Sequence, residues 1–272
     1  MMNADFLYTT ASGRLLFKCL QKAGIFRVTA WFLRTKASRH LIPSFIEKNG
    51  IDMKPFKGQT YDSFASFFAR ERSVCLSSYA PDTLISLCDS MLSVYPVTED
   101  MAIPMKGSIY TLTDLIPDAD TAALFRNGLC LVFRLRASDY HHFCCFDDGH
   151  ILKTAYIPGQ LHSVQPIALR HFPVFRLNRR WWSLLDTEHF GRAAQIEIGA
   201  MMVGGVSIAV GDAHFSHGDE MGHFELAGST IVLLLDSSVR KKLVFEERIR
   251  PALNGETEVE VQIGSVIGSV TK

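Results

Sequence analysis

The sequence predicts an α+β protein in which N-terminal helices precede a β-rich body. Apolar residues recur at helical spacing between residues 12 and 48. After about residue 80, short runs rich in Val, Ile and Leu alternate with Gly, Pro, Asn and Asp, which is typical of strands and turns. The chain has 272 residues, 47% of them hydrophobic, and this is enough for one large domain with a sizeable core. Helices followed by a series of strands indicate the α+β class.

The N-terminal helices are predicted from apolar spacing and from the residues that interrupt it. The first helix carries its apolar residues at helical spacing: Leu15, Leu16, Cys19 and Leu20. Gly24 breaks this pattern, and a second apolar stretch covers residues 28–33. Pro43 can open a short helix through Lys48, with Gly50 after its end. A further helix is predicted over residues 62–70, with three phenylalanines on one face: Phe64, Phe67 and Phe68.

The body is predicted to begin near residue 51 and to run to the end of the chain. Its clearest strands are five apolar runs bounded by turn residues: 129–135, 196–198, 203–210, 231–235 and 259–263. We therefore divide the chain into a helical segment, 1–50, and a body, 51–272.

Charge is balanced overall but not along the chain. There are 28 basic and 28 acidic residues, so composition gives no indication of nucleic-acid binding. The first 48 residues, however, carry an excess of six positive charges. A basic and apolar segment suits an anionic membrane surface, although it is equally compatible with a helical subdomain whose basic face is simply solvated.

The cysteines and the hydropathy pattern exclude several classes. No two of the six cysteines form a CxxC pair, so a zinc ribbon is not expected, and we predict no metal site. A chain of this length does not need disulfides, and we expect reduced thiols in a cytosolic setting. The first residues lack the features of a signal peptide, and no apolar run reaches the roughly 18 residues of a spanning helix. The chain can thus lie on a membrane but is not expected to cross one.

A Gly-Ser-Thr tripeptide, residues 228–230, stands before an apolar strand and permits a specific reaction. The Ser229 hydroxyl can attack the carbonyl of Gly228, where the missing Cβ allows a strained backbone. Elimination of the resulting ester leaves dehydroalanine, which hydrolyses to a pyruvoyl group. Such a ketone forms a Schiff base with a substrate amine and accepts the electrons released by decarboxylation. Taken alone, however, Gly-Ser is most often an ordinary turn.

This chemistry needs a base and an acid, and two segments offer them. Asp139, His141 and His142 follow the predicted strand 129–135 directly. Asp89 lies beside another predicted strand. From spacing alone, these residues are more often a turn aspartate and partly buried histidines than parts of a catalytic site.

The chain resembles bacterial-type phosphatidylserine decarboxylases along nearly its whole length. Ordered segments carry the resemblance: 7–14, 61–70 with its Phe-Phe-x-Arg helix, Ser-Leu-Cys-Asp-Ser at 86–90, Lys106-Gly107 with 110–112, Asp-Tyr-His-His-Phe at 139–143, 158–166, 178–180, 187–188, 199–204, 218–224 and Gly228-Ser229-Thr230. The last of these is similar to that family's processing tripeptide. Any one match is weak, and their order along the chain is what makes the resemblance specific.

The resemblance implies roles for individual residues. Ser229 would be the nucleophile and the pyruvoyl precursor, and cleavage after Gly228 would yield a large chain, 1–228, and a small chain, 229–272. Asp89 would orient a histidine during processing, as in other Ser-His-Asp systems. His141 would support decarboxylation of phosphatidylserine to phosphatidylethanolamine and CO2. The resemblance further implies a homodimer, assembled from large and small chains, at the cytoplasmic face of the cell membrane.

The chain departs from the family pattern at the position of the processing histidine, where it has Cys144. A cysteine can serve as a base only as a thiolate, which requires a lowered pKa. His141 could instead do both jobs, or His142 could take over. Other replacements are His142 for Arg, Leu87 for Pro, Gln165 for Asn and His217 for Lys.

Three alternatives remain at this point. The chain could be an unprocessed relative that binds anionic phospholipid without turnover. It could be a pyruvoyl-dependent decarboxylase of a soluble amino acid, although the basic aromatic helices argue against this. It could also be a swinging-arm carrier, but no lysine lies at a hairpin tip in a suitable context.

Overall fold

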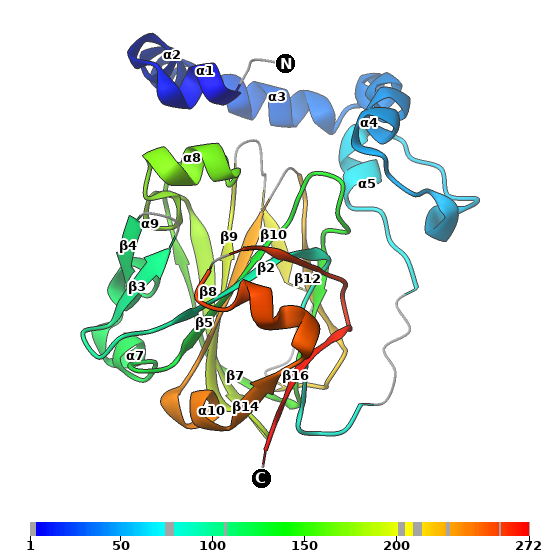
Figure 1. Cartoon of the computed structure of the whole chain (residues 1–272). Coiled ribbons are helices and arrows are strands. Elements are labelled where there is room, and N and C mark those ends of the chain that lie inside the picture. Colours follow the sequence, from blue (N-terminus) through cyan, green and yellow to red (C-terminus); the bar gives the residue numbers. More distant parts are fainter. Residues whose placement is uncertain are drawn as a thin grey trace.

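The fold is described from a computed structural model that covers residues 4–73, 79–105, 108–200, 205–208, 214–226, 229–255 and 257–271. Helices gather at the N-terminus and a body rich in strands follows, as the α+β prediction required (Figure 1). Several residues named above lie outside the described ranges: Lys106, Gly107, Gly228, and residues 201–204 and 209–210, as does Cys75, one of the six cysteines.

The N-terminal region is a series of short helices. They are α1 (Ala4–Thr9), α2 (Ala11–Lys22), α3 (Ile25–Leu33), the 3-10 helix η1 (Lys36–Leu41), α4 (Ile42–Asn49), the 3-10 helix η2 (Lys54–Phe56) and α5 (Phe64–Phe68). Thr10 caps α2, because its hydroxyl accepts a hydrogen bond from the Gly13 amide at 2.9 Å. Gly24 separates α2 from α3 with a φ of 71°, a left-handed conformation that glycine adopts without strain. The predicted helices and their breaks are thus confirmed.

The body is built on an eight-stranded antiparallel sheet in the order β11-β7-β8-β9-β13-β5-β2-β15. Its strands are β2 (Ser90–Pro96), β5 (Leu129–Arg134), β7 (Gly149–Ile157), β8 (Arg180–Thr187), β9 (Gly191–Ile198), β11 (His214–Phe215), β13 (Thr230–Leu235) and β15 (Val259–Val261). The segment after Ser229 supplies β13, which pairs with both β9 and β5. Every residue of β13 is buried, because packed layers cover both faces of the sheet.

Three smaller sheets and further helices surround the large sheet. The sheets are β10-β12-β6, β1-β16-β14 and β3-β4. Their strands are β1 (Thr83–Ile85), β3 (Ala102–Met105), β4 (Ser108–Thr111), β6 (His142–Cys144), β10 (Val206–Ile208), β12 (Glu220–Phe224), β14 (Leu243–Phe245) and β16 (Val266–Val270). The helices are α6 (Leu112–Leu115), α7 (Ala119–Ala123), α8 (Pro166–His171), α9 (Val174–Leu177), α10 (Ser237–Lys242) and the 3-10 helix η3 (Glu247–Ala252).

The large sheet separates two hydrophobic cores. Val232 and Leu234 of β13 face one core, while Ile231, Leu233 and Leu235 face the other, as strand alternation requires. The second core also contains apolar residues of the β10-β12-β6 sheet, so this small sheet packs over the same face as Ile231. That face carries the residues discussed below.

The N-terminal helices lie across one end of the body and are anchored to it (Figure 1). Leu7, Tyr8 and Phe17 are buried in the first core. The Tyr8 hydroxyl accepts a hydrogen bond from the Ser163 amide at 2.8 Å, and the Phe17 ring lies 5.0 Å from the ring of His162. Among the described residues, no helix has the length and apolar character needed to cross a bilayer.

Candidate active site

Ser229 lies at the entrance to the central strand β13 and is fully buried. Its carbonyl oxygen accepts a hydrogen bond from the Leu135 amide at 2.9 Å, which extends the β5–β13 pairing by one residue. The following residue, Thr230, pairs with Arg134 on one side and Ile198 on the other. Ser229 is therefore fixed between strands rather than placed in an exposed turn.

His141 is fully buried and has one unsatisfied ring nitrogen. Its Nδ1 lies 2.8 Å from the carbonyl oxygen of Asp139, so Nδ1 carries the proton and donates it. Nε2 is then the lone-pair nitrogen, and it has no hydrogen-bond partner among the described residues. Burial, together with the positive charge of Arg70, lowers the pKa of His141 to about 3 despite the bond to Asp139. The imidazole is thus neutral at physiological pH, with a lone pair on Nε2.

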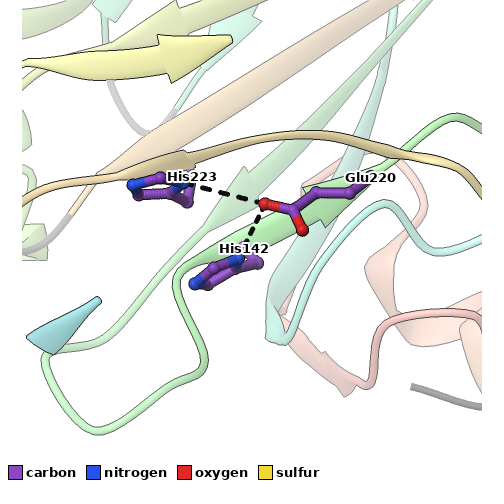
Figure 2. A group of neighbouring side chains, drawn as sticks. All are labelled: His142, Glu220 and His223. Carbon is purple, nitrogen blue, oxygen red and sulfur yellow. Dashed lines mark hydrogen bonds and ion pairs between the residues drawn. The ribbon is translucent and has the colours of Figure 1, made fainter. Parts of the chain in front are cut away.

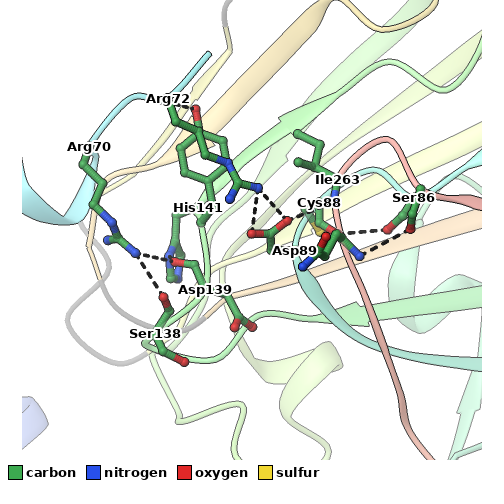
Figure 3. A network of polar contacts seen from close by, with 12 residues as sticks. Arg70, Arg72, Ser86, Cys88, Asp89, Ser138, Asp139, His141 and Ile263 are labelled. Carbon is green, nitrogen blue, oxygen red and sulfur yellow. Dashed lines mark hydrogen bonds and ion pairs between the residues drawn. The ribbon is translucent and has the colours of Figure 1, made fainter. Parts of the chain in front are cut away.

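The segment that carries His141 is held by two arginines. The guanidinium of Arg70 donates from Nη2 to the carbonyl oxygens of Ser138 and Asp139, at 3.0 and 3.3 Å (Figure 3). The Asp139 carboxylate accepts hydrogen bonds from the amide and Nε of Arg136, at 2.7 and 3.0 Å. Arg70 is the arginine of the Phe-Phe-x-Arg motif. In the structure, this motif therefore supports the backbone of the segment that carries His141.

Backbone hydrogen bonds bring the segments of Ser229 and His141 to the same end of the sheet. Leu135 donates to the carbonyl of Ser229, and Phe224 donates to the carbonyl of His141 at 3.0 Å. Segments 135–141 and 224–229 are therefore tied together at both of their ends. The two segments are therefore neighbours, and the roles that the resemblance implies for Ser229 and His141 stay predictions.

Asp89 is held by an arginine and an amide. Nη2 of Arg72 lies 2.9 Å from both carboxylate oxygens, and the Ile263 amide donates to Oδ1 at 2.9 Å (Figure 3). The guanidinium of Arg72 also stacks over the ring of Tyr140, 4.6 Å from its centroid. In this uncleaved chain, Asp89 reaches the histidine segment through Arg72 and Tyr140 instead of through the His141 ring.

Cys144 lies in β6 and is almost completely buried. Its thiol points to the carbonyl oxygen of Ser86 at a sulfur–oxygen distance of 3.8 Å, and its amide donates to Leu87 at 2.9 Å. Burial raises the pKa of Cys144 to about 12. The residue therefore lies beside the Asp89 segment as a neutral thiol, a form that cannot act as a base at neutral pH.

Glu197 is a buried carboxyl on the same face that sequence reasoning passed over. It pairs across β9–β13 with Ile231, two residues beyond Ser229. Gln195 donates to its Oε1 at 2.8 Å, while Oε2 has no partner in the described part of the chain. Burial raises the pKa of Glu197 to about 7. The available signal was its place among apolar residues on a predicted strand, where a carboxyl is costly to bury.

Comparisons with known proteins identify the family. The family described as phosphatidylserine decarboxylase matches residues 61–269. The chain is similar to phosphatidylserine decarboxylase proenzyme 2 of Clostridium acetobutylicum, with 38% identity over 97% of this chain and 90% of that protein. It is also 34% identical to phosphatidylserine decarboxylase proenzyme of Ruminiclostridium cellulolyticum, over 97% of this chain and 89% of the relative. A proenzyme of the same description from Desulfitobacterium hafniense is 35% identical over 83% of this chain and 78% of its own length.

Proposed function

Because the chain belongs to the phosphatidylserine decarboxylase family, as the sequence predicted, we propose that it cleaves itself before Ser229, converts this residue to a pyruvoyl group and decarboxylates phosphatidylserine to phosphatidylethanolamine. The observation that carries the proposal is that Ser229 and His141, both fully buried, lie on segments tied together by backbone hydrogen bonds, with Nε2 of His141 lacking a partner among the described residues. The pyruvoyl ketone supplies an acceptor for the electron pair that is released with CO2.

The processing reaction uses groups of this chain. The Ser229 hydroxyl gives its proton to a base and attacks the Gly228 carbonyl carbon, and the C–N bond breaks to leave an ester and a free amine. A base then removes the Cα proton of residue 229 and the Gly228 carboxylate departs. The dehydroalanine that remains carries a free amino group. Water hydrolyses this group, ammonia leaves, and the ketone of the pyruvoyl group is formed.

The orientation of His141 supports its role in proton transfer. The Asp139 carbonyl fixes the tautomer with the lone pair on Nε2, and Arg70 holds that carbonyl in place. Because burial disfavours the imidazolium, His141 would hold a proton only when negative charge on a bound substrate stabilises it, and the neutral ring would then re-form as the proton is passed on. We therefore propose His141 as the proton carrier of decarboxylation. Cys144, with its thiol protonated, supports no such role.

The N-terminal helices support action at a membrane surface. Three large apolar side chains of α2 and α3 are mostly exposed, Leu15 at 65%, Val28 at 59% and Trp31 at 67%. The same segment carries the excess of basic residues. Exposed apolar groups beside positive charge favour an interface that contains anionic lipid. We propose that segment 1–50 holds the body, 51–272, on the cytoplasmic face of the cell membrane, and that the processed chains assemble as a homodimer.

One observation favours a second candidate, an unprocessed relative that binds anionic phospholipid. The position of the family's processing histidine holds Cys144, whose pKa is raised to about 12. In that case the fold and the lipid contact would persist without turnover.

Intact-mass measurement of the purified chain separates the two candidates. The proposed function predicts two fragments, 1–228 and 229–272, with the small one blocked by a pyruvoyl group. The Ser229→Ala variant should remain one chain and release no CO2 from phosphatidylserine. The control is Ser93→Ala, which removes another buried hydroxyl from the same sheet and should still be cleaved. A single full-length species in the unmodified protein, bound to lipid without CO2 release, would establish the second candidate.

A further inference from the structure

His142, Glu220 and His223 form a side-chain cluster that the proposed reaction does not use (Figure 2). One ligand atom from each residue lies within 4.8 Å of the other two. We propose that these residues bind a divalent transition-metal ion of the Zn²⁺ type, through two imidazole nitrogens and one carboxylate oxygen. The inference stands apart from the proposed function, because it concerns binding at a neighbouring site.

Strand register places the three residues together. His142 of β6 is the direct cross-strand partner of His223 of β12. Alternation along a regular strand would send Glu220 and His223 to opposite faces. The register shifts between Glu220 and Gly222, and this irregularity brings the carboxylate to the side of the histidines.

Gly222 permits the close packing of strands at this irregularity. A Cβ atom at this position would lie 2.3 Å from the carbonyl oxygen of Ser207 and 2.9 Å from the Phe143 ring. No larger residue fits there without moving backbone. The arrangement of the cluster is therefore fixed by the strands around it.

The donor atoms converge on one point. Nδ1 of His142 lies 2.9 Å and Nδ1 of His223 lies 3.7 Å from the same oxygen, Oε1 of Glu220 (Figure 2). A metal ion at this focus would take bonds of about 2.0–2.2 Å from each donor. The Glu220 side chain, 48% exposed, is free to withdraw by the needed distance. The two imidazole rings are stacked, with an angle of 24° between their planes. Because nearly parallel rings do not point their Nδ1 lone pairs at one position, the His223 ring must turn toward the ion when it binds.

The hydrogen bonds of His142 favour a metal at Nδ1. Its Nε2 faces the carbonyl oxygen of Ala69 at 3.3 Å, while Nδ1 faces the carboxylate. A neutral imidazole has a single N–H and cannot donate to both acceptors. With a metal at Nδ1, the proton on Nε2 is donated to Ala69, which is the usual second contact of a metal-bound histidine. Tyr140 stacks on the His142 ring at 4.6 Å and holds its plane.

The ligand set indicates the class of ion. Two imidazoles and one carboxylate suit Zn²⁺ and its neighbours in the first transition series better than Mg²⁺ or Ca²⁺, which prefer oxygen ligands. Three protein ligands leave a fourth position for water or a small anion. The sequence did not indicate this metal site, because His142 and Glu220 are 78 positions apart and match no spacing motif.

Calorimetric titration of the full-length protein with ZnCl₂, after dialysis against chelator, tests the proposal. We expect one equivalent to bind with a Kd of about 10 μM or tighter, and the midpoint of thermal unfolding to rise with Zn²⁺. Co²⁺ should show the visible band of a four-coordinate site. Loss of one ligand in His223→Ala or Glu220→Gln should weaken binding at least about 100-fold. Both residues are partly exposed, so their replacement spares the core.

A second histidine pair provides the matched control. His150 and His214 lie with ring centroids 5.5 Å apart, and His150 is 3.7 Å from the Asp186 carboxylate. The His214→Ala variant should bind Zn²⁺ as the unmodified chain does. Absence of binding, undiminished binding in both cluster variants, or loss of binding only in His214→Ala would each overturn the proposal. The first of these results would leave His142 and Glu220 as a hydrogen-bonded pair without a metal.

Discussion

Nη2 of Arg72 lies 2.9 Å from both carboxylate oxygens of Asp89, and the Arg72 guanidinium stacks on Tyr140 beside His141. The Ile263 amide completes the environment of Asp89. Ile263 belongs to the segment that would become the small chain, whereas Asp89, Arg72 and Tyr140 belong to the large one. Asp89 therefore joins the two prospective fragments and supports the segment of His141.

The Arg72–Asp89 pair is expected to be coupled in stability. In the uncleaved Ser229→Ala background, Arg72→Gln and Asp89→Asn should each lower the free energy of unfolding. The double variant should lower it by less than the sum of the two single effects. We expect a coupling of about 1 kcal/mol, because both side chains are about one-fifth exposed and solvent screens the pair only in part. Urea unfolding measures the free energy of unfolding of the background, the two single variants and the double variant. Additive losses would show that the ion pair contributes nothing.

Two replacements of His141 distinguish its proposed role in proton transfer from its structural hydrogen bond to the Asp139 carbonyl. His141→Asn can keep a donor near the Asp139 carbonyl but lacks the Nε2 lone pair, whereas His141→Ala lacks both. We expect each variant to release CO2 at least about 10²-fold more slowly than the unmodified chain, the usual scale for a lost general acid or base. The rate is measured per cleaved chain, so that a processing defect does not count as slow turnover. Near-normal turnover by His141→Asn would limit His141 to a structural role.

Cys144→Ala tests whether the thiol replaces the missing histidine. Because burial raises the pKa of Cys144 to about 12, we expect the thiol to contribute no base, and self-cleavage should stay within about threefold of normal. The variant should lose about 1–2 kcal/mol of stability from the small cavity that it leaves. The time course of cleavage on a denaturing gel is the measurement. A cleavage rate that falls by 100-fold in a variant that remains folded would make Cys144 the processing base.

The exposed apolar residues of α2 and α3 are expected to mediate membrane contact. Each such side chain stabilises binding by about 1.5–3 kcal/mol when it is fully buried in lipid, so the triple variant Leu15→Ser, Val28→Ser, Trp31→Ser should bind at least tenfold more weakly. Sedimentation with vesicles of phosphatidylserine and phosphatidylcholine measures this. The control replaces three exposed apolar residues of the body, Ile109, Leu124 and Val244, with serine. Equal losses in both triple variants would remove the special role of the helices.

Glu197 should make stability depend on pH. Its pKa is raised from an ordinary value of 4.5 to about 7 in the folded chain. Between these values the unfolded carboxyl releases its proton while the folded one retains it, so stability decreases as pH rises through this window and stays lower above it. In the Ser229→Ala background, Glu197→Gln should therefore be more stable at pH 8, by at most about 3 kcal/mol, with little gain near pH 4.5.

Urea unfolding across this pH range tests the Glu197 prediction. Glu99→Gln, which changes an exposed carboxyl just after β2, is the control and should leave the pH profile unchanged. A profile for Glu197→Gln that runs parallel to that of the unsubstituted background would contradict the prediction.

Much of the fold was predictable because its causes are local. Apolar spacing and the break at Gly24 placed the N-terminal helices, and alternating turn residues placed strands such as β5, β9 and β13. The Gly-Ser-Thr tripeptide and the segments around Asp89 and His141 indicated the family, which the comparisons confirm. These signals lie within a few residues of one another, and the sequence displays them directly.

The state of each candidate group depended instead on contacts between distant segments. Cys144 has a raised pKa because strands from other parts of the chain exclude water from its thiol, and His141 is neutral for the same reason. Strand register paired His142 with His223, and a register shift added Glu220. The sequence by itself determined the class of fold and the family, and it indicated Ser229 as the candidate nucleophile. Tertiary structure alone decided which groups carry protons and which residues meet, because solvent exclusion and cross-strand pairing are properties of the packed chain.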